Sequence, residues 1–276
     1  MSTWKQLSPS IHHRLAFGAA YGLTDVGLVR RSNEDNFLID PALGLVAVAD
    51  GMGGHDGGEV AACLALETLR AALGDAARDP LLDTTILDSV DPDATWQDQH
   101  MPAVLAAHRA VDRANAEVYR ANLRAGHDEG GGMGTTLTGF WRGAPAGPLV
   151  VFHVGDSRLY RHRQGELAVL TRDQTLYQQA LEAGLSDELP PRNLLLQAIG
   201  PTAQITPDVK VFPAERGDIY LLCSDGLYGT TPHAAIAQAL AGCDGQALDA
   251  CGAALVALAK AHGSRDNITA VLVMVG

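Results

Sequence analysis

The sequence predicts an α+β fold: two antiparallel β-sheets packed face to face with helices outside them, a four-layer αββα sandwich. Three observations support this prediction. Many apolar segments are continuous runs rather than alternations, which is typical of strands covered on both faces. The gaps between neighbouring strands are short, which favours antiparallel pairing over helical crossovers. The strands also come in groups separated by pairs of helices, which suits layered packing.

The N-terminal part is expected to contain three strands and the first helix. Apolar runs bounded by turn residues predict strands at 14–22, 36–40 and 44–50. A glycine-rich turn follows at 51–58, and apolar residues at helical spacing then predict an amphipathic helix from about Glu59 to Leu73.

The middle of the chain is expected to contain one helix and four strands. Residues 75–100 are rich in Asp, Pro and Thr, so they are expected to form an excursion from the core. A helix is expected from about Pro102 to Arg124, because proline fits the first helical turn, and glycine-rich residues 126–134 end it. The expected strands are 135–142, 148–156, 158–163 and 166–170.

The C-terminal part is expected to alternate between helices and strands. A short helix is expected from about Gln174 to Ala183, followed by an irregular proline-rich piece at 185–192. Strands are then expected at 209–214, 218–225 and 267–275, and helices at 232–240 and 245–262.

The composition excludes several classes of protein. The formal net charge of −12 argues against nucleic acid as a partner, because nucleic-acid-binding surfaces are basic. No run approaches the roughly 20 apolar residues of a membrane-spanning helix, and no signal peptide is recognisable, so no membrane contact and a cytoplasmic location are expected. The four cysteines lack metal-site spacing and are interpreted as small buried residues in a reducing compartment.

Four aspartates stand at the ends of strongly apolar strands. Asp50, Asp156 and Asp225 each follow such a strand, and Asp266 directly precedes the last one. In an antiparallel arrangement these ends can meet at one edge, where the carboxylates would repel one another unless cations neutralise them. Ligands that are all oxygen favour Mg²⁺ or Mn²⁺. A turn or a helix cap explains any one aspartate equally well, but it explains four together less well.

Glycine directly follows two of these aspartates, in Asp50-Gly51 and Asp225-Gly226. Glycine permits a tight turn and the close approach of a backbone carbonyl to an ion. A single Asp-Gly pair is a common turn, whereas two such pairs at the ends of buried strands favour a binding site.

Six motifs in a fixed order resemble those of the metal-dependent protein phosphatases of type 2C, in their bacterial form. The similarity extends from about Ala16 to Val275, nearly the whole chain. The motifs are GLVRRSNEDN (27–36), VAVADGMGGHDGGEVA (46–61), GMGTTLTG (132–139), HVGDSRLYR (153–161), LLCSDGLYG (221–229) and SRDNITAVLV (264–273).

The resemblance implies two divalent cations, Mg²⁺ or Mn²⁺, that activate a water for attack on a phosphate ester. Asp50 would bridge the two cations, and the Gly51 carbonyl would complete the protein ligands of the first. Asp225 and Asp266 would hold the second cation, and Asp156 would bind a weaker third one.

The resemblance also implies catalytic roles for three residues of the first motif. Arg30 would grip the substrate phosphate, because a guanidinium fork matches phosphate oxygens. Glu34 would orient water at the cations, and Asp35 would support that arrangement.

The family implies a serine/threonine protein phosphatase with one catalytic domain at 10–276, a flap at about 172–199 and an N-terminal extension at 1–9. Its expected partners are proteins phosphorylated by a cognate serine/threonine kinase, and a monomer is expected. Two positions depart from many relatives. Met52 stands where animal and plant members have a histidine that could act as general acid, with His55 nearby in a loop. Gly229 stands where relatives often have a third-metal aspartate.

Other functions remain open at this point. A phosphatase-like scaffold that acts only by binding would be expected to lack metal ligands, yet Asp50, Asp225 and Asp266 are all present. A two-metal phosphoesterase acting on nucleotides or small phosphates would have the same core, although the acidic chain disfavours polyanionic substrates. A phosphate-binding P-loop at 51–58 is disfavoured because the Lys-Ser/Thr ending is absent. Ser224 as a nucleophile is disfavoured against a strand-end hydroxyl.

Overall fold

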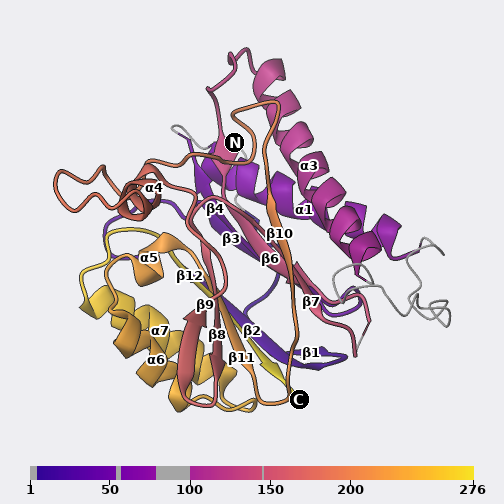
Figure 1. The fold of residues 1–276 in the computed structure, drawn as a ribbon, viewed down its shortest axis with the longest axis vertical. Coiled ribbons are helices and arrows are strands. Elements are labelled where there is room, and N and C mark those ends of the chain that lie inside the picture. Colours follow the sequence, from indigo (N-terminus) through magenta and orange to yellow (C-terminus); the bar gives the residue numbers. More distant parts are fainter. Residues whose placement is uncertain (1–4, 54–56, 79–99, 145) are drawn as a thin grey trace.

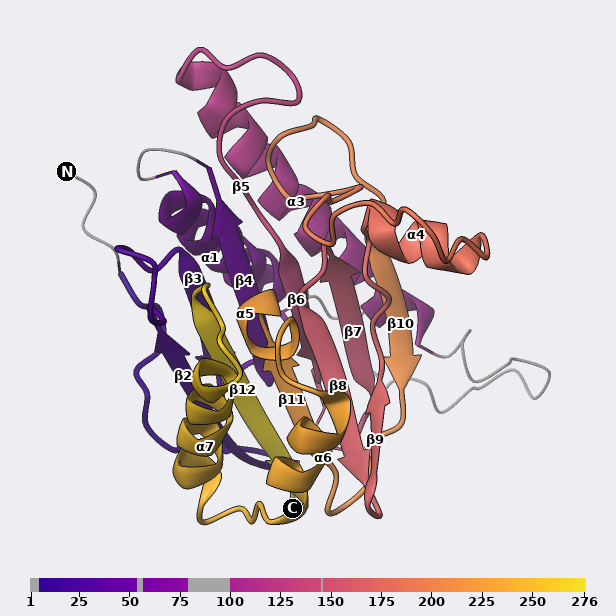
Figure 2. The ribbon, with the colours of Figure 1, turned by 90° about the vertical axis from the view of Figure 1, so that its left-hand side faces the viewer.

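The computed structural model describes residues 5–53, 57–78, 100–144 and 146–276, and it confirms the predicted four layers. Two antiparallel sheets pack face to face, with one pair of long helices outside each sheet (Figure 1). Figure 2, turned by 90°, shows α6 and α7 in front of the sheets and α1 and α3 behind them.

The first sheet joins the two ends of the chain. In it, β2 near the N-terminus pairs with β12 near the C-terminus, and all neighbouring strands are antiparallel. In spatial order its strands are β1 (His13–Leu15), β2 (Gly18–Asp25), β12 (Ile268–Val275), β11 (Ile219–Cys223), β8 (Arg158–Arg163) and β9 (Glu166–Val169).

The second sheet is built mainly from the N-terminal half of the chain. In spatial order its strands are β10 (Asp208–Phe212), β7 (Leu149–Val154), β6 (Leu137–Trp141), β4 (Leu45–Met52) and β3 (Asp35–Asp40), with the short β5 (Gly134–Thr135) paired to the end of β4.

The described helices lie on the outer faces or beside the site. Helices α1 (Gly58–Ala76) and α3 (Met101–Arg124) cover the second sheet, whereas α6 (His233–Ala241) and α7 (Leu248–Ala261) cover the first. Two shorter helices, α4 (Leu176–Glu182) and α5 (Asp225–Tyr228), lie in the connections after β9 and β11. No described helix combines the length and the apolar character needed to cross a bilayer.

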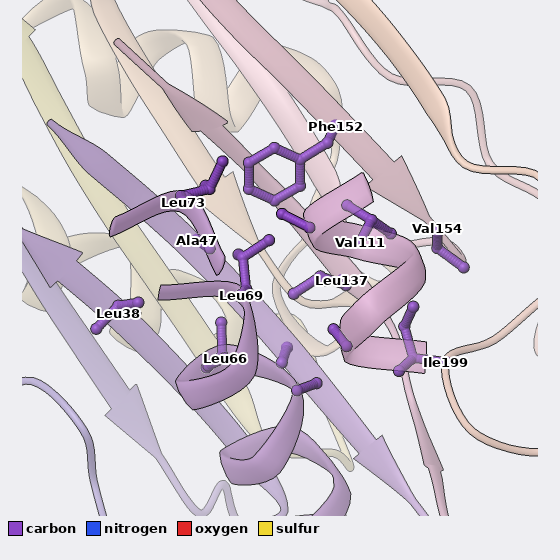
Figure 3. Packing of buried hydrophobic residues seen from close by; sticks show 14 of the residues in the cluster. Leu38, Ala47, Leu66, Leu69, Leu73, Val111, Leu137, Phe152, Val154 and Ile199 are labelled. Atoms are coloured by element: carbon purple, nitrogen blue, oxygen red, sulfur yellow. The ribbon is translucent and has the colours of Figure 1, made fainter. Parts of the chain in front are cut away.

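Three apolar clusters fill the three interfaces between the layers. Leu66, Leu69 and Val111 from the outer helices pack against Leu137 and Phe152 of the second sheet, as Figure 3 shows from close by. The second cluster lies between the sheets, and the third lies between the first sheet and α6 and α7.

Strand β11 explains why its sequence is a continuous apolar run. Tyr220 and Leu222 point into the cluster between the two sheets. Ile219, Leu221 and Cys223 point to the other face, into the cluster under α6 and α7. Because alternate side chains of a strand point to opposite faces, a strand buried on both sides is apolar at every position.

The expected single strand at 14–22 is wrong, because β1 and β2 form a hairpin in which Leu15 pairs with Gly18. The turn brings Phe17 into the cluster between the sheets, where its side chain is buried. A Cβ on Gly18 would lie 1.9 Å from the Met274 carbonyl oxygen, so the hairpin also depends on close contact with β12. A local apolar pattern does not reveal such a contact.

Other element boundaries also differ from expectation. The strand expected at 135–142 is divided into β5 and β6, and the short helix α5 was not expected at all. Helix α4 begins two residues later than expected, after Thr175, whose hydroxyl accepts a hydrogen bond from the Gln178 amide at 3.1 Å. Most of the expected excursion at 75–100, and His55 in the expected turn, lie outside the described residues.

Candidate functional site

Strand pairing brings the aspartates of both sheets to one end of the sandwich. In the second sheet, Asp35 at the start of β3 pairs with Asp50 near the end of β4. In the first sheet, Cys223 at the end of β11 pairs with Ala270 of β12 and with Arg158 of β8. Asp225, which follows β11, and Asp266 and Asp156, which precede β12 and β8, therefore lie at one end of that sheet.

A direct link between the sheets is made at Asp35, which is 1% exposed. Its Oδ2 atom accepts hydrogen bonds from the Ser224 hydroxyl at 2.6 Å and from the Thr269 hydroxyl at 2.7 Å. Ser224 and Thr269 belong to the first sheet, whereas Asp35 belongs to the second. Asp35 thus fixes the position of one sheet edge against the other.

The hydroxyl hydrogen bonds around Asp35 have one consistent direction. Because Thr269 donates its single hydroxyl proton to Asp35, it accepts from Thr24 across the 2.7 Å contact between their hydroxyls. Thr24 in turn accepts from the Asn33 side-chain amide at 2.8 Å. This chain of donors ends on the carboxylate and stabilises its negative charge.

Burial and mutual repulsion raise the pKa values of the converging acids. Burial, together with the neighbouring Asp225 and Asp266 carboxylates, raises the pKa of Asp35 to about 7, although the two hydroxyl hydrogen bonds act in the opposite direction. Burial, together with the surrounding acids, also raises the pKa of Asp50 well above its usual range. Burial and Asp266 raise the pKa of Asp225 to about 6, although a hydrogen bond with Asp50 lowers it in part.

The donor set fits divalent cations, since several carboxylates are held together against repulsion and the site supplies oxygen ligands. No three Asp, Glu, His or Cys side chains within the described ranges already form a group that could hold an ion as they stand. The Asp266 carboxylate is paired with Arg30, whose Nη2 lies 2.7 Å from Asp266 Oδ2. Binding of a cation at Asp266 would therefore compete with Arg30 for the same carboxylate.

Gly226 permits the loops bearing Asp225 and Asp266 to meet. A Cβ on Gly226 would lie 1.9 Å from the Asn267 carbonyl oxygen and 3.4 Å from the Asp266 Cβ. Any other residue at this position would push the two loops apart. The sequence predicted that the glycine after Asp225 permits a tight turn and a close approach. In the structure, the backbone that approaches it closely is that of Asn267.

We expect Gly226→Ala to lower the melting temperature by roughly 5–10 °C, because an overpacked core position costs about 1–3 kcal/mol. Gly242→Ala is the matched control, since nothing lies within 4 Å of its added Cβ and its φ of −92° suits alanine. Thermal unfolding followed by circular dichroism would compare the two. Equal melting temperatures would show that the loops approach less closely than described.

Gly51 and Gly58 together make the space in which Glu34 lies. A Cβ on Gly58 would lie 2.1 Å from Glu34 Oε2, and a Cβ on Gly51 would lie 2.5 Å from the Glu34 carbonyl oxygen. That carbonyl accepts a hydrogen bond from the Gly51 amide at 3.2 Å. Glu34 is therefore held directly beside Asp50 and Gly51 at the end of β4, next to the converging acids.

Asn267 was missed by the sequence analysis, although its side chain holds the first motif in place. Its Oδ1 accepts a hydrogen bond from the Glu34 amide at 2.9 Å. Its Nδ2 donates to the carbonyls of Val26 at 3.0 Å and Ser32 at 2.9 Å. In sequence, the only signal was its position directly after Asp266.

Asp156 lies at the other side of the site, where it is close to Asp173 as well as to Asp225. Burial, together with Asp225 and Asp173, raises its pKa to about 7. The neighbouring Asp173 is paired with Arg158 through two hydrogen bonds of 2.7 and 2.8 Å, and the Arg158 guanidinium lies 3.8 Å from the centre of the Tyr228 ring. Asp173 and Tyr228 were also missed by the sequence analysis.

The structure also shows the surroundings of Ser224 and Gly229, two residues considered in the sequence analysis. Ser224 is 1% exposed, and its hydroxyl accepts a hydrogen bond from the Thr269 amide at 3.0 Å while donating to Asp35, as a strand-end hydroxyl would. Gly229 is exposed, and a Cβ there would lie 2.7 Å from the Asp225 carbonyl oxygen. An aspartate at Gly229 would thus require a shift of the backbone.

Comparison with protein families gives a match to most of the chain. A family model described as Protein phosphatase 2C matches residues 30–272. The chain is 32% identical over 259 residues to the serine/threonine phosphatase stp of Listeria innocua, covering 91% of this chain and 93% of that protein.

Solved structures agree with this match. The serine/threonine phosphatase PstP/Ppp of Mycobacterium tuberculosis has a TM-score of 0.75 and 31% identity, covering 93% of this chain and 97% of that chain. A structure of the PstP catalytic domain in complex with two manganese ions has a TM-score of 0.71 and 32% identity, covering 93% of this chain and 97% of that chain.

Proposed function

We propose, since the chain belongs to the protein phosphatase 2C family, that it is a metal-dependent serine/threonine protein phosphatase. It hydrolyses phosphoserine and phosphothreonine in proteins with the help of two Mg²⁺ or Mn²⁺ ions, as its relatives' names and the manganese complex of PstP support. The observation that carries the proposal is the group of carboxylates from both sheets whose pKa values are raised by burial and by one another.

Four of these aspartates and Gly51 are proposed to hold the cations. Asp50 would bind both, with the Gly51 carbonyl as a further ligand of the first, and Asp225 and Asp266 would hold the second. Asp156 is proposed for a third, weaker ion, on the side of the site that contains Asp173. When bound, the cation pair lowers the pKa of a water and stabilises charge that builds up on the phosphoryl oxygens.

The other predicted residues act on the substrate and the water. Arg30 is proposed to bind the phosphate with its guanidinium, which is half-exposed and therefore accessible from solvent. Glu34, held beside Gly51 at the end of β4, is proposed to orient the attacking water through hydrogen bonds. Asp35 is a positioning residue, because its carboxylate joins the strand ends that bear Asp50 and Asp225.

The proposed function is tested by hydrolysis of p-nitrophenyl phosphate and of a phosphothreonine peptide with and without Mn²⁺. We expect turnover of both substrates that requires the metal. Absence of turnover in metal-loaded protein, with a working phosphatase as positive control, would favour the binding scaffold. A strong preference for nucleotides over the peptide would favour a small-molecule phosphoesterase.

We expect Arg30→Ala to raise KM for phosphopeptides by about 10-fold or more, with a smaller change in kcat, because the phosphate loses a charge-assisted contact. Arg31→Ala is the matched control, since Arg31 is the exposed neighbour of Arg30. Steady-state kinetics at saturating Mn²⁺ would measure both. If kcat and KM both stay unchanged in Arg30→Ala, Arg30 does not belong to the site.

The cellular setting is part of the same proposal. The substrates are proposed to be targets of a cognate serine/threonine kinase, and the protein is proposed to act as a cytoplasmic monomer. We also propose that 10–276 forms one catalytic domain after an N-terminal extension at 1–9, and that 172–199 forms a flap. Support for the flap comes from Gln174, whose side-chain oxygen accepts a hydrogen bond from the Gly155 amide at 2.9 Å, directly beside Asp156.

A further inference from the structure

Two consecutive aliphatic side chains are held in solvent immediately before the proposed phosphate-binding arginine. Leu28 is 64% exposed, the highest value among the large hydrophobic side chains of the described residues, and Val29 is 52% exposed. Single exposed leucines are normal on protein surfaces. A consecutive pair directly adjoining Arg30 at a catalytic centre is a different situation, because a bound substrate must pass next to it.

The backbone of this loop, residues 26–32, is held firmly at both ends. The Asn267 side chain donates to the carbonyls of Val26 and Ser32, at 3.0 and 2.9 Å. The Gly27 amide donates to Asp25 Oδ1 at 2.8 Å, and Asp25 is in turn paired with Lys260 at 2.7 Å.

Gly27 allows the loop to lie close against the backbone of Asp266. It has a φ of +78°, and a Cβ there would lie 2.1 Å from the Asp266 carbonyl oxygen. The loop therefore lies directly on the backbone that bears Asp266. Since Leu28 and Val29 are presented by a backbone that is already ordered, a ligand that covers them loses little additional conformational freedom.

We infer that Leu28 and Val29 form an apolar contact for the side chain next to the phosphorylated residue, so that this phosphatase prefers phosphothreonine segments with an aliphatic neighbour. The inference rests on the proposed function, because it requires Arg30 to hold the substrate phosphate. Leu28 and Val29 directly precede Arg30 in the chain and are exposed, so a peptide whose phosphate is held by Arg30 passes beside them.

Charge favours an apolar neighbour over an acidic one. The chain has a formal net charge of −12, and Asp50, Asp225 and Asp266 lie together at the site. With cations bound these carboxylates are neutralised, but the negative net charge of the chain still disfavours an aspartate or glutamate next to the phosphorylated residue, whereas an aliphatic side chain would gain by covering Leu28 and Val29.

The experiment uses the full chain with Mn²⁺ and phosphothreonine peptides that carry Leu, Ala or Glu at each of the two positions on either side of the phosphothreonine. We expect kcat/KM to be about 5- to 10-fold higher for Leu than for Ala at one of these positions, as for an aliphatic contact on an open surface, and lower still for Glu. In the double variant Leu28→Ser, Val29→Ser, the Leu-over-Ala preference is expected to disappear.

Leu123→Ser is the matched control, because Leu123 is 49% exposed on α3, outside the loop, and its replacement is expected to leave the preference intact. Hydrolysis of p-nitrophenyl phosphate, which has no flanking residue, measures the chemistry of each variant. The single variants Leu28→Asn and Val29→Thr provide a second test if the double variant melts early.

Three results would overturn the inference while leaving the proposed function in place: wild-type enzyme that hydrolyses all peptides equally, a preference for Glu, or a Leu preference that survives in the variants. A dimer in sedimentation that dissociates in the double variant without any change in peptide preference would assign the surface to a second copy, and would also overturn it. Failure to hydrolyse any phosphopeptide or p-nitrophenyl phosphate would instead contradict the proposed function.

Discussion

Replacing Asp225 with Asn is expected to lower turnover by several orders of magnitude at limiting Mn²⁺, whereas the fold persists. The substitution removes a negative charge from the proposed cation ligands, and a cation pair that is not held cannot activate water. The side chain keeps nearly the same shape, so packing is retained. Since burial and Asp266 raise the pKa of Asp225 to about 6, loss of its charge also relieves repulsion in metal-free protein.

The measurements are kcat across a Mn²⁺ titration and thermal unfolding in the presence of a chelator. Asp128→Asn is the matched control, because Asp128 is an exposed aspartate on the loop after α3, and both its activity and its melting temperature are expected to match the wild type. Near-normal turnover of Asp225→Asn at limiting metal would remove Asp225 from the site. Unfolding of the metal-free variant would show that the charge supports the fold instead.

The metal-free protein is expected to lose stability as pH rises from about 6.5 to 8. Burial raises the pKa values of Asp35 and Asp156 to about 7, from an ordinary value of 3.8. Between these values the folded state binds more protons than the unfolded state, so the free energy of unfolding falls with rising pH up to the folded pKa and levels off above it; the range from about pH 6.5 to 8 contains the last part of this fall. Added Mn²⁺ is expected to reverse the loss, because it binds the ionised carboxylates of the folded state.

The pH range from about 6.5 to 8 avoids the opposing contribution of His153 to stability. Burial lowers the pKa of His153 from 6.5 to about 4, which makes stability rise with pH, but only below about 6.5. Asp50→Asn provides a further control, because removal of one repelling carboxylate is expected to flatten the pH dependence. Melting temperatures of metal-free wild type that stay constant between pH 6.5 and 8 would contradict the prediction.

The fold could be predicted from the sequence because its layers impose a local pattern. A strand such as β11, buried on both faces, must be apolar at every position, and that is visible without any knowledge of its neighbours. The aspartates that follow such strands were recognisable for a related reason. A charged residue next to a fully buried strand stands out, and antiparallel pairing then brings the strand ends together.

The features that could not be predicted depend on contacts between distant segments. The hairpin at Phe17 exists because that side chain reaches the space between the sheets, and Gly18 requires the Met274 carbonyl nearby. The role of Asn267 depends on carbonyl groups more than 230 positions earlier in the chain. In sequence, such an asparagine cannot be distinguished from one in an ordinary turn.

The pairing of β2 with β12 has a consequence for how the protein is made. Val275 pairs with Gly18, and Ile268 pairs with Asp25, so β2 can form this pairing only after β12 has been synthesised. On the ribosome, the first sheet cannot close until the segment after Asp266 has emerged, and Asp35 until then lacks the hydroxyl of Thr269. A nascent chain that has not yet exposed residues 266–275 therefore lacks Asp266 and Thr269 at the proposed site.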